Sequence, residues 1–281
     1  MIELKKYIIV YTSASRPDFF KLSYESFKRH LFISPQISRE IVNWAIEQPD
    51  FSNLSYESFK RHLNIKDGYT TPICLHEDFC NEKRSREIVN WAIDQNCFYT
   101  IQSNPRIGLI GSCMKMLDHA RQHKIDFVLR LCDDFIFTKN VNIKSLIDIM
   151  SENKNVNQII FNKRPNNSKK GKFIKKEVVF NNQKLTVSPR WSSLNSIWRV
   201  DFIYPYFLEC WNRIKNTPSQ FNPWRELDFT LFKNFGIIDK EIDADWVIEN
   251  LGCYLYGGIN DPDSHVNVHV GAGHSRVFVG K

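Results

Sequence analysis

The sequence predicts an α/β protein built around a mostly parallel central sheet that is flanked by helices. Short apolar runs alternate with amphipathic segments along the first half of the chain, as they do in successive strand–helix–strand units. The clearest strand is the near-continuous apolar run Phe127–Leu131 (FVLRL), which is typical of a parallel strand buried on both faces. With 281 residues, of which 42% are hydrophobic, the chain can bury a large core around such a sheet.

The expected elements follow one another regularly as far as residue 137. The expected strands are Tyr7–Thr12, Thr71–His76, Phe98–Gln102 and Phe127–Leu131, and the expected helices are Ser23–Leu31, Ser85–Ile93 and Gly111–His123. The second half is less regular, with a strand expected at Gln158–Asn162, a hairpin at Glu177–Val187, a further segment at Trp191–Ile203 and a helix at Arg225–Asn234. We therefore expect one domain over residues 1–281, with a ligand-binding half at 1–137 and an irregular half at 138–281.

An internal duplication interrupts the first half of the chain. The segment PDFFKLSYESFKRHL at 17–31 returns as PDFSNLSYESFKRHL at 49–63, and SREIVNWAIEQ at 38–48 returns as SREIVNWAIDQ at 85–95. Two copies, 17–48 and 49–95, are fewer than the three that a solenoid needs, so a local duplication is the better interpretation. The earlier copy either adds a helical segment or displaces the later copy, and the sequence leaves both arrangements open.

The charge and cysteine content restrict the possible partners. Lys and Arg number 38 against 31 Asp and Glu, and a net charge of +7 suits an anionic ligand such as a nucleotide diphosphate, a nucleic acid or a membrane surface. The basic run Lys163–Lys176 lacks the interleaved aromatic residues of a single-strand-binding surface, so it reads as a solvated loop and not as a nucleic-acid site. Seven cysteines without a CxxC spacing indicate reduced thiols and a cytoplasmic protein. No apolar run approaches the ~20 residues of a spanning helix, so no integral membrane segment is expected.

Two adjacent acids, Asp133 and Asp134, are the strongest functional signal. They directly follow the Phe127–Leu131 strand and Cys132, so they should emerge at the carboxyl end of a strand, where open α/β sheets bind ligands. Neighbouring side chains in an extended segment point in opposite directions. One carboxylate could therefore hold a hard divalent cation while the other accepts from a sugar or ribose hydroxyl. The alternative is an ordinary turn, in which Asp is common.

Four segments of the chain resemble family 2 glycosyltransferases and their GT-A-fold relatives: Tyr7–Arg16, His76-Glu77-Asp78, Asn104–Asp118, and the acidic motif Cys132-Asp133-Asp134. The resemblance implies a GT-A-like fold whose first half binds the nucleotide sugar and whose second half lies on the acceptor side. It also implies that Thr12, Ser13 and Arg16 border the nucleotide, that Asp78 accepts from the base, that Arg106 and Asp133 contact the donor, and that Asp134 binds Mn²⁺ or Mg²⁺.

The second half supplies the remaining candidates. Glu226 and Asp228 begin the helix expected after Pro223, where this family commonly carries its catalytic carboxylate, although acids in a first helical turn are also favoured by the helix dipole. A late His ligates the metal in some of the resembling enzymes, which favours His269 or His274. Trp191–Ser196 resembles the small, polar acceptor-side strand of these enzymes, in which Trp191 and Asn195 could contact a sugar. Core packing is the alternative for Trp191.

The resulting hypothesis is a glycosyltransferase that moves a sugar from a nucleotide-diphosphate donor to an unknown acceptor hydroxyl, such as that of a glycan, with metal assistance and inversion. Three alternatives stay open: a nucleotide-sugar-binding protein without turnover, a sugar-phosphate nucleotidyltransferase, and a nucleic-acid-binding protein.

Overall fold

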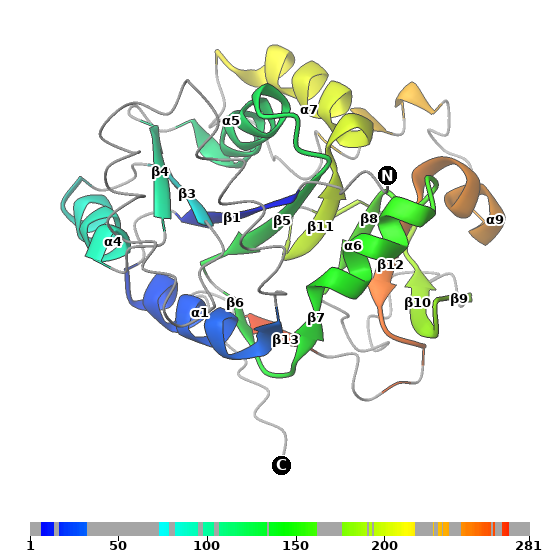
Figure 1. Ribbon diagram of the computed structural model, residues 1–281. Coiled ribbons are helices and arrows are strands. Elements are labelled where there is room, and N and C mark those ends of the chain that lie inside the picture. The colour runs from blue at the N-terminus through cyan, green and yellow to red at the C-terminus, as the bar shows by residue number, and fades with distance from the viewer. Residues whose placement is uncertain are drawn as a thin grey trace.

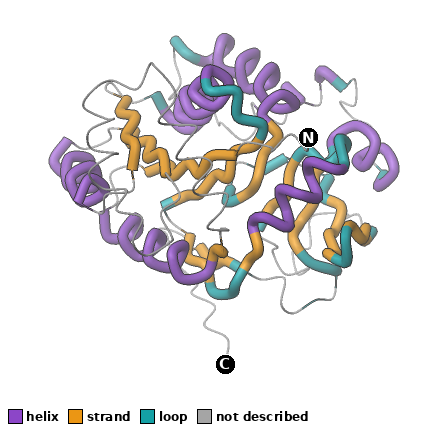
Figure 2. The backbone as a smooth tube through the Cα atoms, in the orientation of Figure 1, coloured by secondary structure: helices purple, strands orange, loops and turns teal. Residues whose placement is uncertain are grey.

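The computed structural model describes residues 7–13, 17–32, 73–78, 82–94, 98–103, 107–133, 135–161, 176–189, 191–192, 194–216, 227, 230–231, 233–235, 243–259, 261 and 266–269. A nine-stranded sheet runs through the molecule, and helices lie on both of its sides (Figures 1 and 2). In spatial order its strands are β4 (Phe98–Ser103), β3 (Ile73–Asp78), β1 (Tyr7–Ser13), β5 (Phe127–Cys132), β11 (Ser196–Arg199), β8 (Gln158–Ile160), β12 (Cys253–Tyr256), β10 (Gln183–Val187) and β9 (Glu177–Phe180).

The predicted α/β class is confirmed. Strands β4, β3, β1 and β5 are parallel, and β8 and β12 form another parallel pair. Strand β11 is antiparallel to β5 and β8, and the β9–β10 hairpin continues the sheet antiparallel to β12. The sheet contains strands from both halves of the chain. The assignment of all 281 residues to one domain stays a prediction, since several segments lie outside the described residues.

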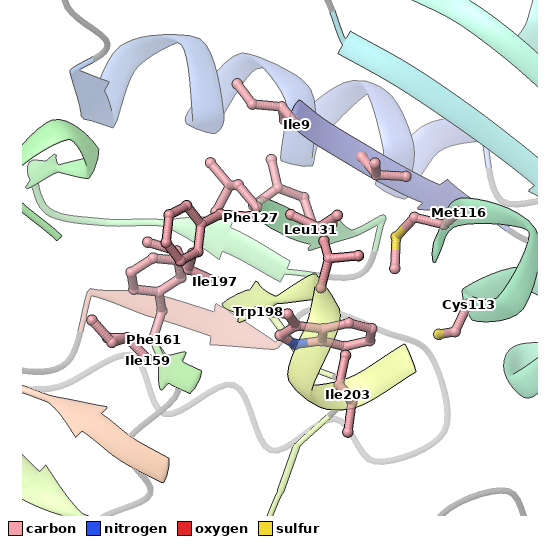
Figure 3. Close-up of a cluster of buried hydrophobic side chains, with 14 of the residues drawn as sticks. Ile9, Cys113, Met116, Phe127, Leu131, Ile159, Phe161, Ile197, Trp198 and Ile203 are labelled. Carbon is pink, nitrogen blue, oxygen red and sulfur yellow. The ribbon is translucent and has the colours of Figure 1, made fainter. Parts of the chain in front are cut away.

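Among the described residues, five longer helices lie against the sheet: α1 (Pro17–His30), α4 (Glu82–Asp94), α5 (Gly108–Gln122), α6 (Ile143–Glu152) and α7 (Val200–Ile214). In Figure 1, α5 and α7 lie above the sheet and α1 lies below it. Figure 3 shows Trp198 of β11 and Ile203 of α7 on the same side of the sheet as Cys113 and Met116 of α5. Short elements complete the fold: β2 (Leu31–Phe32) pairs with β7 (Val141–Asn142), β6 (Phe135–Phe137) pairs with β13 (Asn267–His269), and α9 (Ala244–Trp246) leads into the π-helical turn η2 (Val247–Leu251).

Most of the expected elements in the first half are confirmed within a few residues. Helices α6 and α7 were not predicted, and the segment Trp191–Ile203 contains β11 and the start of α7. Helix α7 contains Pro205 near its N-terminus, and it buries one stripe of side chains that includes Phe207 and Cys210. The residues described within the expected helix Arg225–Asn234 are helical.

The described residues include one copy of each duplicated block. The first copy of the first block is α1, whereas the second copy of SREIVNWAI is α4. Phe20 and Tyr24 of α1 pack edge-to-face against Trp91 of α4, with ring centroids 5.5 and 5.2 Å apart. The Nζ atom of Lys21 lies 2.9 Å from Oε1 of Glu87. The other copies, at 38–48 and 49–63, lie outside the described residues.

Helices α5 and α7 approach each other closely at Gly111. A Cβ atom built on Gly111 would lie 2.9 Å from the Trp211 ring and 2.8 Å from the Cβ of Ile107. Gly111 therefore provides room for an aromatic ring of the neighbouring helix.

We expect Gly111→Ala to destabilise the protein by about 1–3 kcal/mol, because the added methyl group must displace the Trp211 ring in a packed interior. Urea unfolding at neutral pH measures this loss. Gln122→Ala, at an exposed position of the same helix, is the control and should change stability by less than about 0.5 kcal/mol. Equal stability of Gly111→Ala and wild type would contradict the packing account.

Candidate functional site

The carboxyl ends of β1 and β5 form the natural ligand edge of this sheet. From β1 the chain adds β3 and then β4 on one side, and it returns to add β5 on the other side. The strand order therefore reverses between β1 and β5, where the register pairs Thr12 with Cys132. In open α/β sheets, ligands bind outside the carboxyl ends of the strands at such a switch point.

Several of the predicted donor-site residues lie on this edge. Thr12 and Ser13 end β1, Asp78 ends β3, and Asp133 directly follows β5. Their backbones are thereby brought together from three neighbouring parallel strands. The side chains of Ser13 and Asp78 lie outside the described residues, as do Arg16, Arg106 and Asp134 as a whole. The roles of these residues stay predictions.

The acidic segment is fixed to the sheet at its first two residues. Asp133 is 1% exposed, and its backbone N–H donates to the carbonyl oxygen of Thr12 at 3.2 Å. The N–H of Cys132 donates to Oδ1 of Asn195 at 2.7 Å. The β1–β5 pairing therefore continues one residue beyond β5, to the first of the two acids.

Helix α1 holds the same segment from another side. The Ser23 hydroxyl lies 3.1 Å from the carbonyl oxygen of Cys132, and it also contacts the carbonyl oxygen of Phe135. The N–H of Phe137 donates to the Ser26 hydroxyl at 2.8 Å. These two serines of α1 thus fix the backbone on both sides of Asp133-Asp134.

A buried cation underlies the edge on the α5 side of the sheet. Arg130 is 2% exposed; its Nη2 donates to the Thr12 hydroxyl at 3.1 Å, and its Nη1 lies 2.9 Å from Sγ of Cys132. Its guanidinium also lies 5.7 Å from the centre of the Trp198 ring. Sequence reasoning treated Arg130 only as part of the apolar run FVLRL. The position of Arg130 could have revealed its role, because an arginine stays charged in proteins and a charge inside a strand buried on both faces needs partners.

The two residues before Asp78 on β3 are also buried and polar. His76 and Glu77 both have 0% exposure and point to opposite faces of the strand. Ser85 of α4 donates to Oε1 of Glu77 at 2.7 Å. Burial, followed by the positive charges of Lys115 and Arg130, lowers the pKa of His76 to about 4. His76 is therefore neutral at physiological pH.

This shifted pKa predicts a loss of stability in acid. The pKa of His76 is lower in the folded state than the ordinary value near 6.5, so the unfolded chain binds more protons between these values and stability falls as the pH drops from about 6.5 toward 4. At about pH 5 this one group should cost about 2 kcal/mol relative to neutral pH. Urea unfolding at both pH values tests the expectation, with His76→Gln as the comparison. If that variant loses as much stability as wild type on acidification, His76 is not responsible.

The predicted acceptor residues are both buried. Trp191 is 5% exposed, stacks on Phe202 with centroids 5.7 Å apart, and lies 5.9 Å from Trp198. Its indole N–H has no hydrogen-bond partner among the described residues. Asn195 is 1% exposed and bonds the β5 end, as described above. Direct contact of either residue with an acceptor stays a prediction.

The predicted metal ligands are described only in part. His269 is the last residue of β13, and its backbone pairs with Phe135, the residue after Asp134. The side chain of His269 and the whole of His274 lie outside the described residues. Among the side chains that the structure does describe, no group of three His, Cys, Asp or Glu residues is placed to bind a metal ion. Glu226 and Asp228 also lie outside it, while Leu227 between them is 2% exposed.

No helix in the described part of the chain is both long enough and apolar enough to cross a lipid bilayer.

No protein-family profile and no curated protein sequence matches the chain. Among solved structures, residues 1–349 of S. aureus TarS align with a TM-score of 0.47 and 12% identity, over 90% of this chain and 58% of that one. The same TarS fragment in complex with UDP gives a TM-score of 0.45 and 11% identity over the same shares. The mannosyltransferase PcManGT from Pyrobaculum calidifontis, in complex with GDP-Man and Mn²⁺, gives 0.42 and 8% over 91% and 58%. Likenesses of this size establish neither a family nor an activity.

Proposed function

We propose that the protein is a glycosyltransferase that uses a nucleotide-diphosphate sugar as donor. The observation that carries the proposal is the position of the acidic segment. Asp133 directly follows β5 at the point where the strand order reverses, and its backbone is fixed by Thr12. Ligands of open α/β sheets bind at this place. The acidic motif at this place is also one of the four segments by which the sequence resembles the GT-A enzymes.

In this proposal the donor lies across the ends of β1, β3 and β5. Thr12, Ser13 and Arg16 border the nucleotide, Asp78 accepts from the base, and Arg106 and Asp133 contact the rest of the donor. The net charge of +7 favours the approach of an anionic diphosphate.

A divalent cation, Mn²⁺ or Mg²⁺, is part of this proposal. Residues paired across antiparallel strands have Cα atoms about 4.5–5.5 Å apart, so the pairing of His269 with Phe135 brings this histidine next to the residue that follows Asp134. Asp134 and His269, or His274 farther along the tail, would hold the metal. When bound, such an ion stabilises negative charge on a leaving diphosphate.

The chain's own residues would carry the proton transfer. The carboxylate of Glu226 or Asp228 accepts the proton of the acceptor hydroxyl while the hydroxyl oxygen bonds to the anomeric carbon of the sugar. The bond from that carbon to the donor diphosphate breaks at the same time. Attack from the side opposite the leaving group inverts the anomeric configuration. Trp191 and Asn195 would contribute to the acceptor side.

The test is thermal stabilisation by a panel of nucleoside diphosphates, with and without Mn²⁺. At a concentration of about 100 Kd, a true donor-site ligand should raise the Tm by roughly 5 °C or more. Asp134→Ala should remove the Mn²⁺-dependent part, whereas Asp148→Ala, at a half-exposed acid of α6, should not. If no nucleoside diphosphate stabilises the protein, the donor-site assignment is wrong.

Product analysis then separates the alternatives. Release of a nucleoside diphosphate from a nucleotide sugar supports the transferase, whereas release of pyrophosphate from a nucleoside triphosphate and a sugar phosphate identifies a nucleotidyltransferase. Binding without either product identifies a nucleotide-sugar-binding protein. A salt-dependent affinity for DNA or RNA, without nucleotide-sugar binding, would favour the nucleic-acid-binding alternative.

A further inference from the structure

Asn195 lies where the pairing of β11 with β5 stops. The pairing begins with Ser196 opposite Arg130, so no backbone group of β11 is paired with Cys132. The N–H of Cys132 donates instead to the side-chain Oδ1 of Asn195, at 2.7 Å. A side-chain amide therefore takes the place of a backbone carbonyl at the last residue before the two acids.

Asn195 is itself held firmly. Its backbone carbonyl accepts the N–H of Phe161 at 3.0 Å, just beyond β8, and the residue is 1% exposed. Ser192, three residues before Asn195, is held by Gln158 of β8. The Oε1 atom of Gln158 accepts the Ser192 N–H at 2.9 Å, and its Nε2 contacts the Ser192 carbonyl oxygen. Two buried amide side chains thus connect the ends of β5, β8 and β11.

We propose that Asn195 is a positioning residue for the acidic segment. Its Oδ1 fixes the backbone of Cys132, and thereby the direction in which Asp133 and Asp134 leave the sheet. The Cys132 N–H needs an acceptor, which assigns Oδ1 to that position and leaves Nδ2 without a hydrogen-bond partner among the described residues. This role differs from acceptor contact, and its effect on metal binding rests on the proposed function.

Three variants separate the roles of the amide. Asn195→Leu is similar in size and removes the acceptor, so the buried Cys132 N–H is left unsatisfied. Asn195→Asp keeps an oxygen for that N–H and removes the Nδ2 donor. Thr186→Val is the matched control, because it removes another buried bond, from the Thr186 hydroxyl to the carbonyl oxygen of Gly257 at 2.8 Å, in a different part of the sheet.

Hydrogen–deuterium exchange of peptides covering residues 127–137 measures the positioning directly. We expect Asn195→Leu to speed exchange in this segment by about tenfold or more while β8 and β10 stay protected, and Asn195→Asp and Thr186→Val to leave it near the wild-type rate. Unchanged exchange in Asn195→Leu would overturn the proposal, and so would equal acceleration in Asn195→Asp. This measurement needs no ligand.

Titration with Mn²⁺ alone tests the consequence for the site. We expect Asn195→Leu to raise the Kd for Mn²⁺ by about tenfold or more. The Kd of Asn195→Asp and of Thr186→Val should stay within about threefold of the wild-type value. Equal Mn²⁺ affinity of Asn195→Leu and wild type would overturn the role in the site. If wild type binds no Mn²⁺, the metal part of the proposed function fails instead, and the exchange experiment alone decides the positioning role.

Discussion

Two shortened chains that differ at only two residues are expected to differ in stability by about 3–5 kcal/mol. Deletion of residues 32–63 keeps the first copy of the duplicated block, and deletion of residues 17–48 keeps the second. Each removes 32 residues and joins the same flanking sequence. The shortened chains are therefore identical except that Phe20-Lys21 of the first is Ser52-Asn53 in the second.

Both differences lie in the contact between α1 and α4. Phe20 has 0% exposure and packs edge-to-face on Trp91, and replacing a buried aromatic ring by a small residue costs about 3–5 kcal/mol. Lys21 and Glu87 form a half-exposed ion pair, and such pairs contribute at most about 1 kcal/mol. The second copy should therefore form a weaker α1, and the ring accounts for most of the loss.

Back-substitution identifies the cause. In the chain lacking residues 17–48, Ser52→Phe should restore most of the lost stability, and Asn53→Lys should restore little. Urea midpoints of the four proteins, measured at one pH, give the comparison. Equal stability of the two deletion proteins would mean that α1 does not depend on Phe20. Ser23 and Ser26, which hold the acidic segment, have identical counterparts in the second copy, Ser55 and Ser58, so each shortened chain keeps a serine at both positions.

The part of the fold that could be predicted is the part in which local pattern and tertiary environment agree. Strand β5 reads as an apolar run because both faces of it are buried, and α4 reads as a helix because one stripe of it is apolar. Helix α7 was missed because Pro205 and its aromatic residues disfavour a helix locally, while packing such as Phe207 against Trp198, with centroids 5.3 Å apart, stabilises it.

For the candidate site, only the position of the acidic segment in the sequence could be predicted, and its contacts in three dimensions could not. The position of Asp133 after a buried strand indicated the ligand edge, since the carboxyl ends of parallel strands share one side. The contacts of Arg130, Ser23 and Asn195 depend on strand order and register, which join residues more than 60 positions apart. No local pattern encodes such pairings, so the bond from the Cys132 N–H to the Asn195 side chain could not be predicted from the sequence.

On the proposed mechanism, only one of Glu226→Gln and Asp228→Asn is expected to lower kcat by about 10²–10⁴-fold. Each substitution removes the proton acceptor and keeps the size of the side chain. Leu227 between the two acids is buried, and the nearby Thr230 accepts from Arg213 of α7 at 2.9 Å, so this segment has fixed contacts to the rest of the fold. In the helix expected over Arg225–Asn234, two acids separated by one residue point in nearly opposite directions, and only one can reach the acceptor hydroxyl.

Donor binding provides the control. The residue that acts as base should leave the Kd of the nucleoside diphosphate unchanged to within about threefold, because it takes its proton from the acceptor. The plot of kcat against pH should lose its acidic limb in that variant alone, because this limb reports protonation of the base. If both variants retain wild-type kcat, neither carboxylate is the base. If both lose donor binding, the 226–228 segment belongs to the donor site, and the division of roles between the two halves of the chain must be revised.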